Sequence, residues 1–206
     1  MEDIILVGFG GHAKSVADTI EQSGQFHIAG YTDIEPVNYN KYKWLGTDAE
    51  LERYYKKGVR HVFISVGYMG NCYLRDKLYS IVKKIGYHLP IITDKSAIIA
   101  NNVNINEGTY VGKGAIINAD SYIEKMCIIN SGALVEHESF IESYSHIAVK
   151  ATLCGNVSIG SHTFIGAGTT VLQGLKIGEK CIVGAGSLVL KNIPKQKIIY
   201  GIYKGN

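Results

Sequence analysis

A small group of ionisable residues interrupts an otherwise aliphatic stretch in the middle of the chain. Glu136-His137-Glu138 is followed by His146, and Asn130 precedes His137 by about one repeat of the pattern described below. Imidazole titrates near neutral pH, so histidine is the common general base for removing a proton from an attacking amine or hydroxyl. A neighbouring carboxylate fixes the imidazole tautomer and stabilises the imidazolium. The group therefore predicts proton-transfer catalysis with His137 as the base, Glu138 as its partner and Asn130 as a third member.

This interpretation competes with a simpler one, in which His137 is only a solvated surface side chain. Two flanking carboxylates in a segment with few other acids favour the catalytic interpretation. Consecutive residues on an ideal strand face opposite sides, so His137 and Glu138 can pair only where the chain turns a corner. The chemistry itself requires no serine or cysteine nucleophile.

A six-residue repeat predicts the structural element that positions this group. Every sixth residue from 99 to 189 is Ile, Leu or Val, at sixteen of sixteen positions. No helix has this period, whereas a short strand followed by a corner, three times per coil, does. Residues 93–206 are therefore expected to form an all-β domain, a left-handed parallel β-helix, with about five coils between 99 and 189. His137, two residues after the inward Val135, should lie near a corner and reach the surface.

Small and flexible residues stand where this repeat needs corners. Gly directly follows the inward residue at five positions, and Asn or Gly near the other corners suits backbone at positive φ. The first set is Gly112, Gly160, Gly166, Gly178 and Gly184, and the second is Asn118, Asn130, Gly114, Gly168 and Gly186. A purely structural or ice-binding solenoid is the alternative, but it would carry regular Thr or Ser arrays and no isolated ionisable group.

Residues 1–92 show a different pattern, that of a small α/β domain of the Rossmann-like kind. An apolar run at 4–7 ends in a glycine turn, and a helical period then continues to Gly24. Further strands are expected at 26–31, 59–66 and 88–92, and further helices at 48–57 and 71–85. This alternation predicts a small parallel sheet with helices around it.

The glycine turn carries a loose nucleotide-binding pattern. Gly8-x-Gly10-x-x-Ala13 matches the relaxed dinucleotide fingerprint, and Asp33 follows at the end of the second expected strand, where an acid would meet a ribose hydroxyl. A domain of this size provides only half of a dinucleotide site, so a mononucleotide is the better prediction. The turn is not a Walker loop, because Ala13 stands where that motif needs glycine before Lys14. A tight turn without a ligand is the alternative.

Composition excludes several other classes of function. The net charge of +3 is small and the Lys and Arg residues are scattered, which argues against nucleic acid as a partner. No signal peptide or membrane-spanning segment is expected, so we predict a cytoplasmic protein. Cys72, Cys127, Cys154 and Cys181 form no C-x-x-C pair, so reduced thiols and no metal site are expected.

Over essentially its whole length the chain resembles the sialic acid O-acetyltransferases and the bacillosamine-type aminosugar N-acetyltransferases. The resemblance rests on the turn at 10–14, on Asp33, on the hexapeptides, and on Asn130, His137-Glu138 and His146. It implies that His137 is a general base supported by Glu138. It also implies that two sets of residues bind ligands. Gly10, Gly11, His12 and Asp33 would hold a sugar nucleotide, and His146 with the backbone around Ala167, Gly168 and Ala185 would contact acetyl-CoA.

The resemblance further implies a homotrimer with acyl-CoA in the clefts between neighbouring β-helices. The expected activity is direct N-acetylation of a nucleotide-linked 4-amino-4,6-dideoxy sugar for a surface glycan, with O-acetylation of a sialic acid as the alternative. A nucleotide-sensing scaffold without catalysis is disfavoured because His137 and Glu138 are both present. One departure concerns the C-terminal tail, which lacks the second proline that related chains often carry after the glycine at Gly201.

Overall fold

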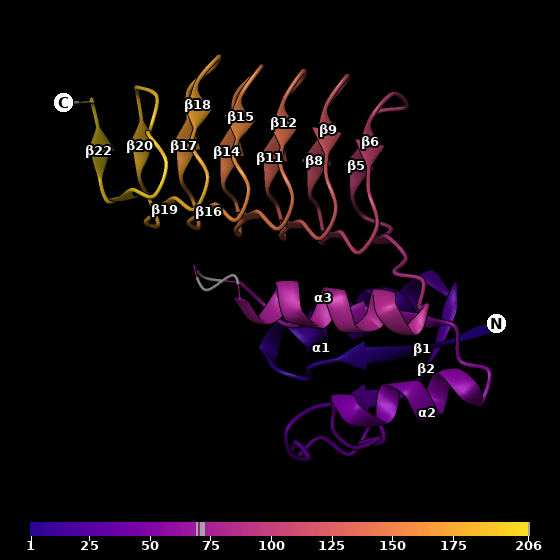
Figure 1. Cartoon of the computed structure of the whole chain (residues 1–206). Coiled ribbons are helices and arrows are strands. Elements are labelled where there is room, and N and C mark those ends of the chain that lie inside the picture. The colour runs from indigo at the N-terminus through magenta and orange to yellow at the C-terminus, as the bar shows by residue number, and fades with distance from the viewer. Residues whose placement is uncertain (69, 71–72, 206) are drawn as a thin grey trace. The chain divides into compact units, whose positions relative to one another are not determined.

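The computed structural model describes residues 1–68, 70 and 73–205 and divides into two compact units. The first consists of Met1–Gly67 and the segment that ends at Lys95, and the second of Tyr68 and its neighbours with the chain from Ser96 onward. The predicted fold class, a Rossmann-like α/β region followed by a left-handed parallel β-helix, is confirmed (Figure 1). Among the described residues, no helix has the length and apolar character needed to cross a membrane.

The first unit is built on a parallel three-stranded sheet in the order β2-β1-β3. Its strands are β1 (Glu2–Val7), β2 (Phe26–Thr32) and β3 (His61–Ile64). The apolar residues 4–7 are fully buried at the centre of the sheet. The chain then turns through Gly8, whose φ is +85°, into helix α1 (Gly11–Ser23), which ends at Gly24 in the left-handed conformation. The strand, glycine turn and helix expected from the sequence are thus present.

The remaining elements of this unit differ from the sequence expectations at their edges. The helix expected at 48–57 is a short 3-10 turn, η1 (Asp48–Glu50), followed by α2 (Leu51–Lys56), and α3 is described over Tyr73–Ile85. The expected start of α3 at Asn71, like Cys72, lies outside the described residues. The strand expected at 88–92 is wrong: His88 makes one isolated bridge to His61, and β4 covers only Ile92–Thr93. Pro90 lies between them and has no N–H to donate to a sheet.

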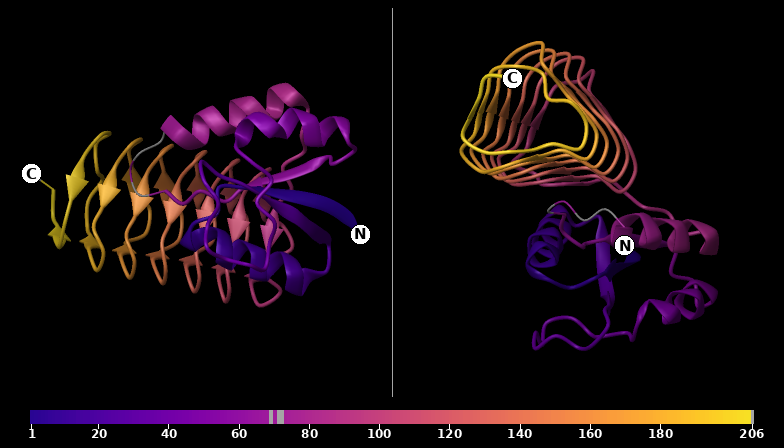
Figure 2. Two further views of the ribbon diagram at one scale, coloured as in Figure 1. Left: turned by 90° about the horizontal axis from the view of Figure 1, so that it is seen from below. Right: turned by 60° about the vertical axis from the view of Figure 1, so that its left-hand side comes forward.

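The second unit is a stack of coils. Their two-residue strands line up into three sheets, and the strands within each sheet run parallel (Figures 1 and 2). The first sheet contains β7 (Tyr110–Val111), β10 (Ile128–Ile129), β13 (His146–Ile147), β16 (Phe164–Ile165), β19 (Ile182–Val183) and β21 (Ile198–Ile199). The second contains β5 (Ile98–Ile99), β8 (Ile116–Ile117), β11 (Leu134–Val135), β14 (Thr152–Leu153), β17 (Thr170–Val171), β20 (Leu188–Val189) and β22 (Ile202–Tyr203). The third contains β6 (Asn104–Ile105), β9 (Tyr122–Ile123), β12 (Phe140–Ile141), β15 (Ser158–Ile159) and β18 (Lys176–Ile177). We call these the β13, β11 and β12 sheets.

The core of the β-helix contains all sixteen predicted inward aliphatics. Those from Val111 to Val189 are buried, and Ile99 and Ile105 in the first coil pack partly buried against the same cluster. A second side chain, in most coils a smaller one, also points inward two residues before each large one, as Ala133 does before Val135 and Ser139 before Ile141. Where it is a serine or threonine, its hydroxyl usually bonds to the backbone of a neighbouring coil, as between Ser139 and the Cys154 carbonyl oxygen. The six-residue count alone did not reveal this second inward position.

Each corner has a left-handed residue three positions after the inward aliphatic. Every such position from 108 to 186 has positive φ, whether glycine or not. The expectation holds for Gly114, Gly168 and Gly186 but is wrong for Asn118 and Asn130, which stand two residues too early. Gly112, Gly160, Gly166, Gly178 and Gly184 serve a different purpose, since a β carbon at each would lie 2.2–2.9 Å from an atom of the next coil. At Gly184 this atom belongs to the Tyr200 side chain, and at the others to the backbone.

The C-terminal tail adds a further partial coil with shorter corners. β21 pairs with β19, β22 pairs with β20, and Ile193 bridges to Ile177. Ile193 is buried only four residues after Val189, and Tyr203 likewise follows Ile199 by four. The sequence left the path of this tail open because its six-residue spacing stops at 189.

Candidate active site

His137 and Glu138 form the exposed corner between β11 and β12. Glu138 is the left-handed corner residue, with φ +57°, so the chain turns between these two side chains and brings them to the same side. The Nδ1 of His137 lies 3.0 Å from Oε2 of Glu138. Because an ionised carboxylate only accepts hydrogen bonds, this contact assigns the hydrogen to Nδ1 and leaves Nε2 with its lone pair. No described residue bonds to Nε2, and the His137 side chain is 57% exposed, so Nε2 can accept a proton from a ligand.

Asn130 and His146 form a second, more enclosed pair on the β13 sheet. His146 is 8% exposed, and its Nδ1 donates to the carbonyl oxygen of Tyr68 at 2.7 Å. Its Nε2 lies 3.2 Å from Nδ2 of Asn130, whose Oδ1 accepts the Ser131 amide. A carbonyl oxygen only accepts, so His146 is held as one neutral tautomer that accepts from Asn130. No sequence pattern links Tyr68 to residues 78 positions away, which is why this contact was missed.

The structure therefore divides the residues that the sequence grouped together. His137 and Glu138 lie at the corner between the β11 and β12 sheets, while Asn130 and His146 lie on the β13 sheet, opposite that corner. The triangular cross-section of the coils is visible in Figure 2. Within one chain these two pairs face different directions. Asn130 thus contacts His146 rather than His137.

In the first unit, Asp33 anchors the glycine turn to the end of β2. Its Oδ2 accepts the Phe9 amide at 2.7 Å, and its Oδ1 accepts the Ile34 amide at 2.7 Å. The half-buried carboxylate therefore also stabilises the local backbone, which the sequence did not predict. Two carboxylate oxygens offer about four lone-pair directions, so Asp33 retains capacity to accept a ligand hydroxyl.

The N-terminus of α1 is open at the turn. Gly10 is its N-cap, no side chain caps the helix, and no acid stands in its first turn. A β carbon at Gly10 or Gly11 would have no neighbour within 4 Å. His12 is half-buried against Gly67, whose β carbon would lie 3.6 Å from the His12 β carbon. A helix N-terminus without a side-chain cap suits a phosphate.

The residues expected to contact acetyl-CoA lie in a column at the corner after the β13 sheet. Ala167, Gly168 and Ala185 are exposed, and the amides of Ala167 and Ala185 have no acceptor among the described residues. The carbonyl oxygen of Ala167 is used, since it accepts the Gly186 amide at 2.8 Å. Two amides without an acceptor, on exposed residues one coil apart, are available to the carbonyl groups of an extended ligand.

The thiols offer no alternative nucleophile in the part of the chain that is described. Cys127 and Cys181 are buried, Cys154 is half-buried, and none forms a disulfide. Burial raises the pKa of the Cys181 thiol, which keeps it protonated. No group of His, Cys, Asp and Glu able to hold a metal ion occurs among residues 1–68, 70 and 73–205.

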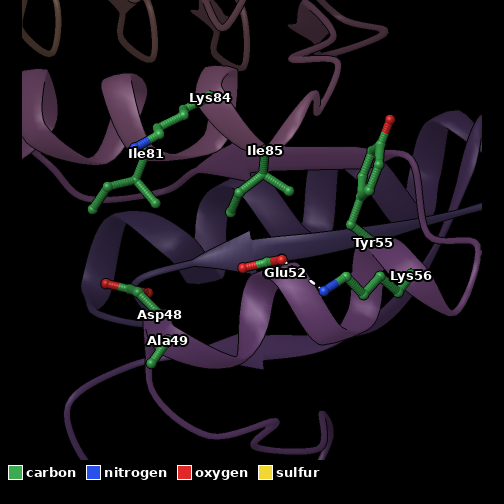
Figure 3. Close-up of a pocket in the computed structure, with 8 residues that line it drawn as sticks. All are labelled: Asp48, Ala49, Glu52, Tyr55, Lys56, Ile81, Lys84 and Ile85. Atoms are coloured by element: carbon green, nitrogen blue, oxygen red, sulfur yellow. Dashed lines mark ion pairs between the residues drawn. The ribbon is translucent and has the colours of Figure 1, made fainter.

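A separate hollow of about 630 Å³ lies between α2 and α3 (Figure 3). Ile81 and Ile85 contribute its apolar part, and Glu52 forms an ion pair with Lys56 at 2.7 Å on its rim. It contains neither a histidine nor a thiol, and none of the predicted site residues lines it. We therefore do not assign the chemistry to this hollow.

Both units match known protein families. Residues 3–82 match the PglD N-terminal domain, and residues 156–191 match the bacterial transferase hexapeptide of six repeats. PerB from Caulobacter crescentus, solved with CoA and GDP-perosamine, is 32% identical with a TM-score of 0.92, over 98% of this chain and 95% of that one. The acetyltransferase domain of PglB from Neisseria gonorrhoeae is 26% identical with a TM-score of 0.91, over 98% and 97% of the two chains. No curated protein sequence gave a significant match.

The stacked hexapeptide coils and the exposed histidine–carboxylate corner define a hexapeptide acyltransferase. With 32% identity to PerB across nearly the whole of both chains, this chain belongs to the PglD-type family of sugar acetyltransferases. The resemblance inferred from the sequence is thereby confirmed, and the protein is an acetyltransferase that uses acetyl-CoA.

Proposed function

We propose that this enzyme transfers the acetyl group of acetyl-CoA directly to the amine of a nucleotide-linked 4-amino-4,6-dideoxy sugar. The observation that carries the proposal is the exposed corner at which Glu138 holds Nδ1 of His137 and leaves Nε2 available. A mutant of the GDP-perosamine N-acetyltransferase of Caulobacter crescentus was also solved with CoA and GDP-perosamine, and it is 31% identical to this chain. A nucleotide-linked aminosugar is thus the acceptor class that the family relationship favours.

In the proposed reaction, His137 acts as the general base. The sugar nitrogen attacks the thioester carbonyl carbon, the new C–N bond forms and the C–S bond breaks. Nε2 of His137 takes the proton from the nitrogen, and the resulting imidazolium can return it to the departing thiolate. Glu138 keeps the hydrogen on Nδ1 and stabilises the imidazolium without itself being protonated.

The nucleotide part of the acceptor is assigned to the glycine turn of the first unit. The uncapped amides at the N-terminus of α1 and the open space over Gly10 and Gly11 suit its phosphates. Asp33 lies at the end of β2, where an acid commonly accepts a ribose hydroxyl. His12, in the first turn of α1, completes this proposed site.

Acetyl-CoA is assigned to the β-helix surface that carries His146 and the corner amides. The N–H groups of Ala167 and Ala185, which have no acceptor among the described residues, would donate to amide oxygens of the pantetheine arm. Gly168, next to Ala167 at this corner, has no side chain that would obstruct the arm. His146, fixed as a neutral tautomer, would then border the cofactor rather than take a proton.

We further propose that the enzyme is a homotrimer with the active site formed between neighbouring β-helices. His137 and His146 face different directions in one chain, so a site that uses both needs a second copy. The outward side chains of the β11 sheet are largely aliphatic, with Ile98 64% and Ile202 63% exposed at its two ends. Burying such a row against another copy removes apolar surface from water.

The test is an acceptor panel. The purified chain is incubated with acetyl-CoA and, in separate reactions, GDP- and UDP-linked 4-aminosugars, the matching sugars without the amine, and sialic acids. Mass spectrometry should show one added acetyl group on an aminosugar nucleotide, stable to mild base as an amide is. Acetylation of sialic acids alone would establish the O-acetyltransferase alternative, and failure with every acceptor would contradict the proposal.

A further inference from the structure

The imidazole of His137 lies directly against Gly155, which occupies the same corner one coil further along the β-helix. A β carbon added at Gly155 would lie 2.6 Å from Cε1, 2.6 Å from Nε2 and 3.3 Å from Cδ2 of His137. Two of these distances are far shorter than any non-bonded carbon contact, which is most favourable near 3.5–4.0 Å. The ring therefore occupies space that every residue other than glycine would fill.

The backbone gives no other reason for glycine at this position. Gly155 does not have positive φ, so an ordinary residue can adopt its conformation. The three atoms nearest to the added β carbon all belong to His137, whereas at Gly160 they belong to the backbone of Gly178 and Glu179. The coil itself would thus accept a side chain at 155.

The repeat supports the same conclusion. Gly155 is the second residue after an inward aliphatic, a position that recurs every six residues from 107 to 185. Every other member of this series has a side chain, including Ala119 and Gln173 at the same corner. Glycine occurs in this series only at the position against which the His137 ring lies.

We propose that Gly155 is a positioning residue for His137, and this proposal rests on the general-base role proposed above. Glu138 holds Nδ1 from one side, and the bare backbone of Gly155 provides the surface on which the Cε1 and Nε2 edge lies. Two constraints on a planar ring with few rotatable bonds fix the direction of Nε2. A glycine that makes room for the base thus sets where the proton is accepted.

The sharpest test is Gly155→Ala. The added methyl group requires the ring to rotate away, which moves Nε2 from its position and disturbs the contact with Glu138. A displacement of about 1 Å of a catalytic group can cost about 10²-fold in rate, so kcat should fall roughly 10- to 100-fold. The KM for acetyl-CoA should stay within about twofold, because a base contributes to the transition state more than to ground-state binding.

Two further measurements separate positioning from a general loss of structure. With ring-labelled histidine, the His137 NMR signal, assigned by its absence in His137→Ala, should move in Gly155→Ala while the other histidine signals stay in place. Gly155→Ala should also lower Tm by a few degrees in the wild-type background, and by less than about 1 °C in the His137→Ala background, where the methyl group has room.

The outcomes distinguish this proposal from the one on which it rests. An unmoved His137 signal, or an equal loss of Tm in both backgrounds, would overturn the positioning role of Gly155. A displaced ring with unchanged kcat would instead overturn the general-base role of His137. A moved signal, a lower kcat and the background-dependent Tm together would support both.

Discussion

At the scale of single residues, a strained corner turns two consecutive side chains into an interacting pair. Glu138 adopts a left-handed conformation that costs a non-glycine residue roughly 1–2 kcal/mol. Asp120 and Asn156 occupy the same corner of the neighbouring coils with φ of +59° and +56°, so three successive coils place a non-glycine residue in this conformation. The fold therefore imposes the turn, and a carboxylate placed at this turn reaches the histidine before it.

His137→Ala should remove most of the turnover and leave acetyl-CoA binding nearly intact. Loss of a general base costs on the order of 10²- to 10⁴-fold in kcat. The pH dependence of kcat that a general base confers should be absent in the variant. Steady-state kinetics across pH would check both statements. A near-normal kcat with an unaltered profile would remove His137 from the mechanism.

Glu138→Ala should have a smaller effect, because water can replace an orienting carboxylate in part but cannot replace the proton acceptor. Asp120→Ala is the matched control, since it removes a carboxylate from the same left-handed corner one coil earlier. It should leave kcat within about twofold. A large loss in both variants would point to the coil rather than to the histidine contact.

At the scale of elements, the sequence predicted periodic features well and local geometry poorly. The inward aliphatics, the strand–turn–helix at the glycine turn and the carboxylate beside His137 all follow from spacing or residue type. Apart from Gly114, Gly168 and Gly186, the left-handed corners were not placed, because several of them carry residues such as Met126, Lys150 and Tyr144 that do not ordinarily favour positive φ. The division of His137 from His146 also escaped prediction, because nearness in sequence says little about which side of a prism a residue faces.

Two kinds of glycine in the β-helix should respond differently to alanine. At Gly114, with φ +64° and no neighbour within 4 Å of an added β carbon, the cost should be the left-handed conformation alone, roughly 1–2 kcal/mol. At Gly160, whose β carbon would lie 2.4 Å from the Glu179 amide nitrogen, the coils must separate, and we expect roughly 3 kcal/mol or more.

Denaturant unfolding or differential scanning calorimetry of both variants would check this order. The reverse ranking would mean that the coils can spread without difficulty and that the left-handed corners dominate stability.

Variants at the glycine turn of the first unit should separate binding of the sugar nucleotide from stability of the fold. His12→Ala and Asp33→Ala should both raise the KM for the sugar nucleotide with little effect on that for acetyl-CoA. Asp33→Ala should also lower Tm, because the amides of Phe9 and Ile34 lose their acceptor, at a cost of about 1–3 kcal/mol. Thermal unfolding and initial rates with each substrate varied would test this. An effect confined to the KM of acetyl-CoA would show that the nucleotide has been assigned to the wrong unit.

At the scale of the whole molecule, the proposed trimer explains how one active site can use two sides of a β-helix. The mass in solution, measured by light scattering, should correspond to three chains. A mass of one or two chains would contradict the proposal.

Mixed trimers provide a stricter test of the shared site. His137→Ala and His146→Ala chains, each poorly active alone at low acetyl-CoA, should regain activity when co-expressed. An interface is restored when one neighbour supplies His137 and the other His146, so about a quarter of the sites should recover in a random mixture. Activity no higher than that of the separate variants would show that each chain builds its own site.

The constant register between coils also bears on how such a protein can change over generations. From β5 to β17, each strand of the β-helix pairs with the strand eighteen residues later, as Leu134 does with Thr152, and each coil bonds only to its neighbours. A tandem in-frame duplication of one coil near the C-terminal end would lengthen the prism and leave every other contact in register. The same duplication between 138 and 154 would insert a foreign coil between His137 and Gly155. Gene lengthening is therefore expected to be selected against within this interval, and likewise between 167 and 185, where it would separate the two amides proposed for acetyl-CoA.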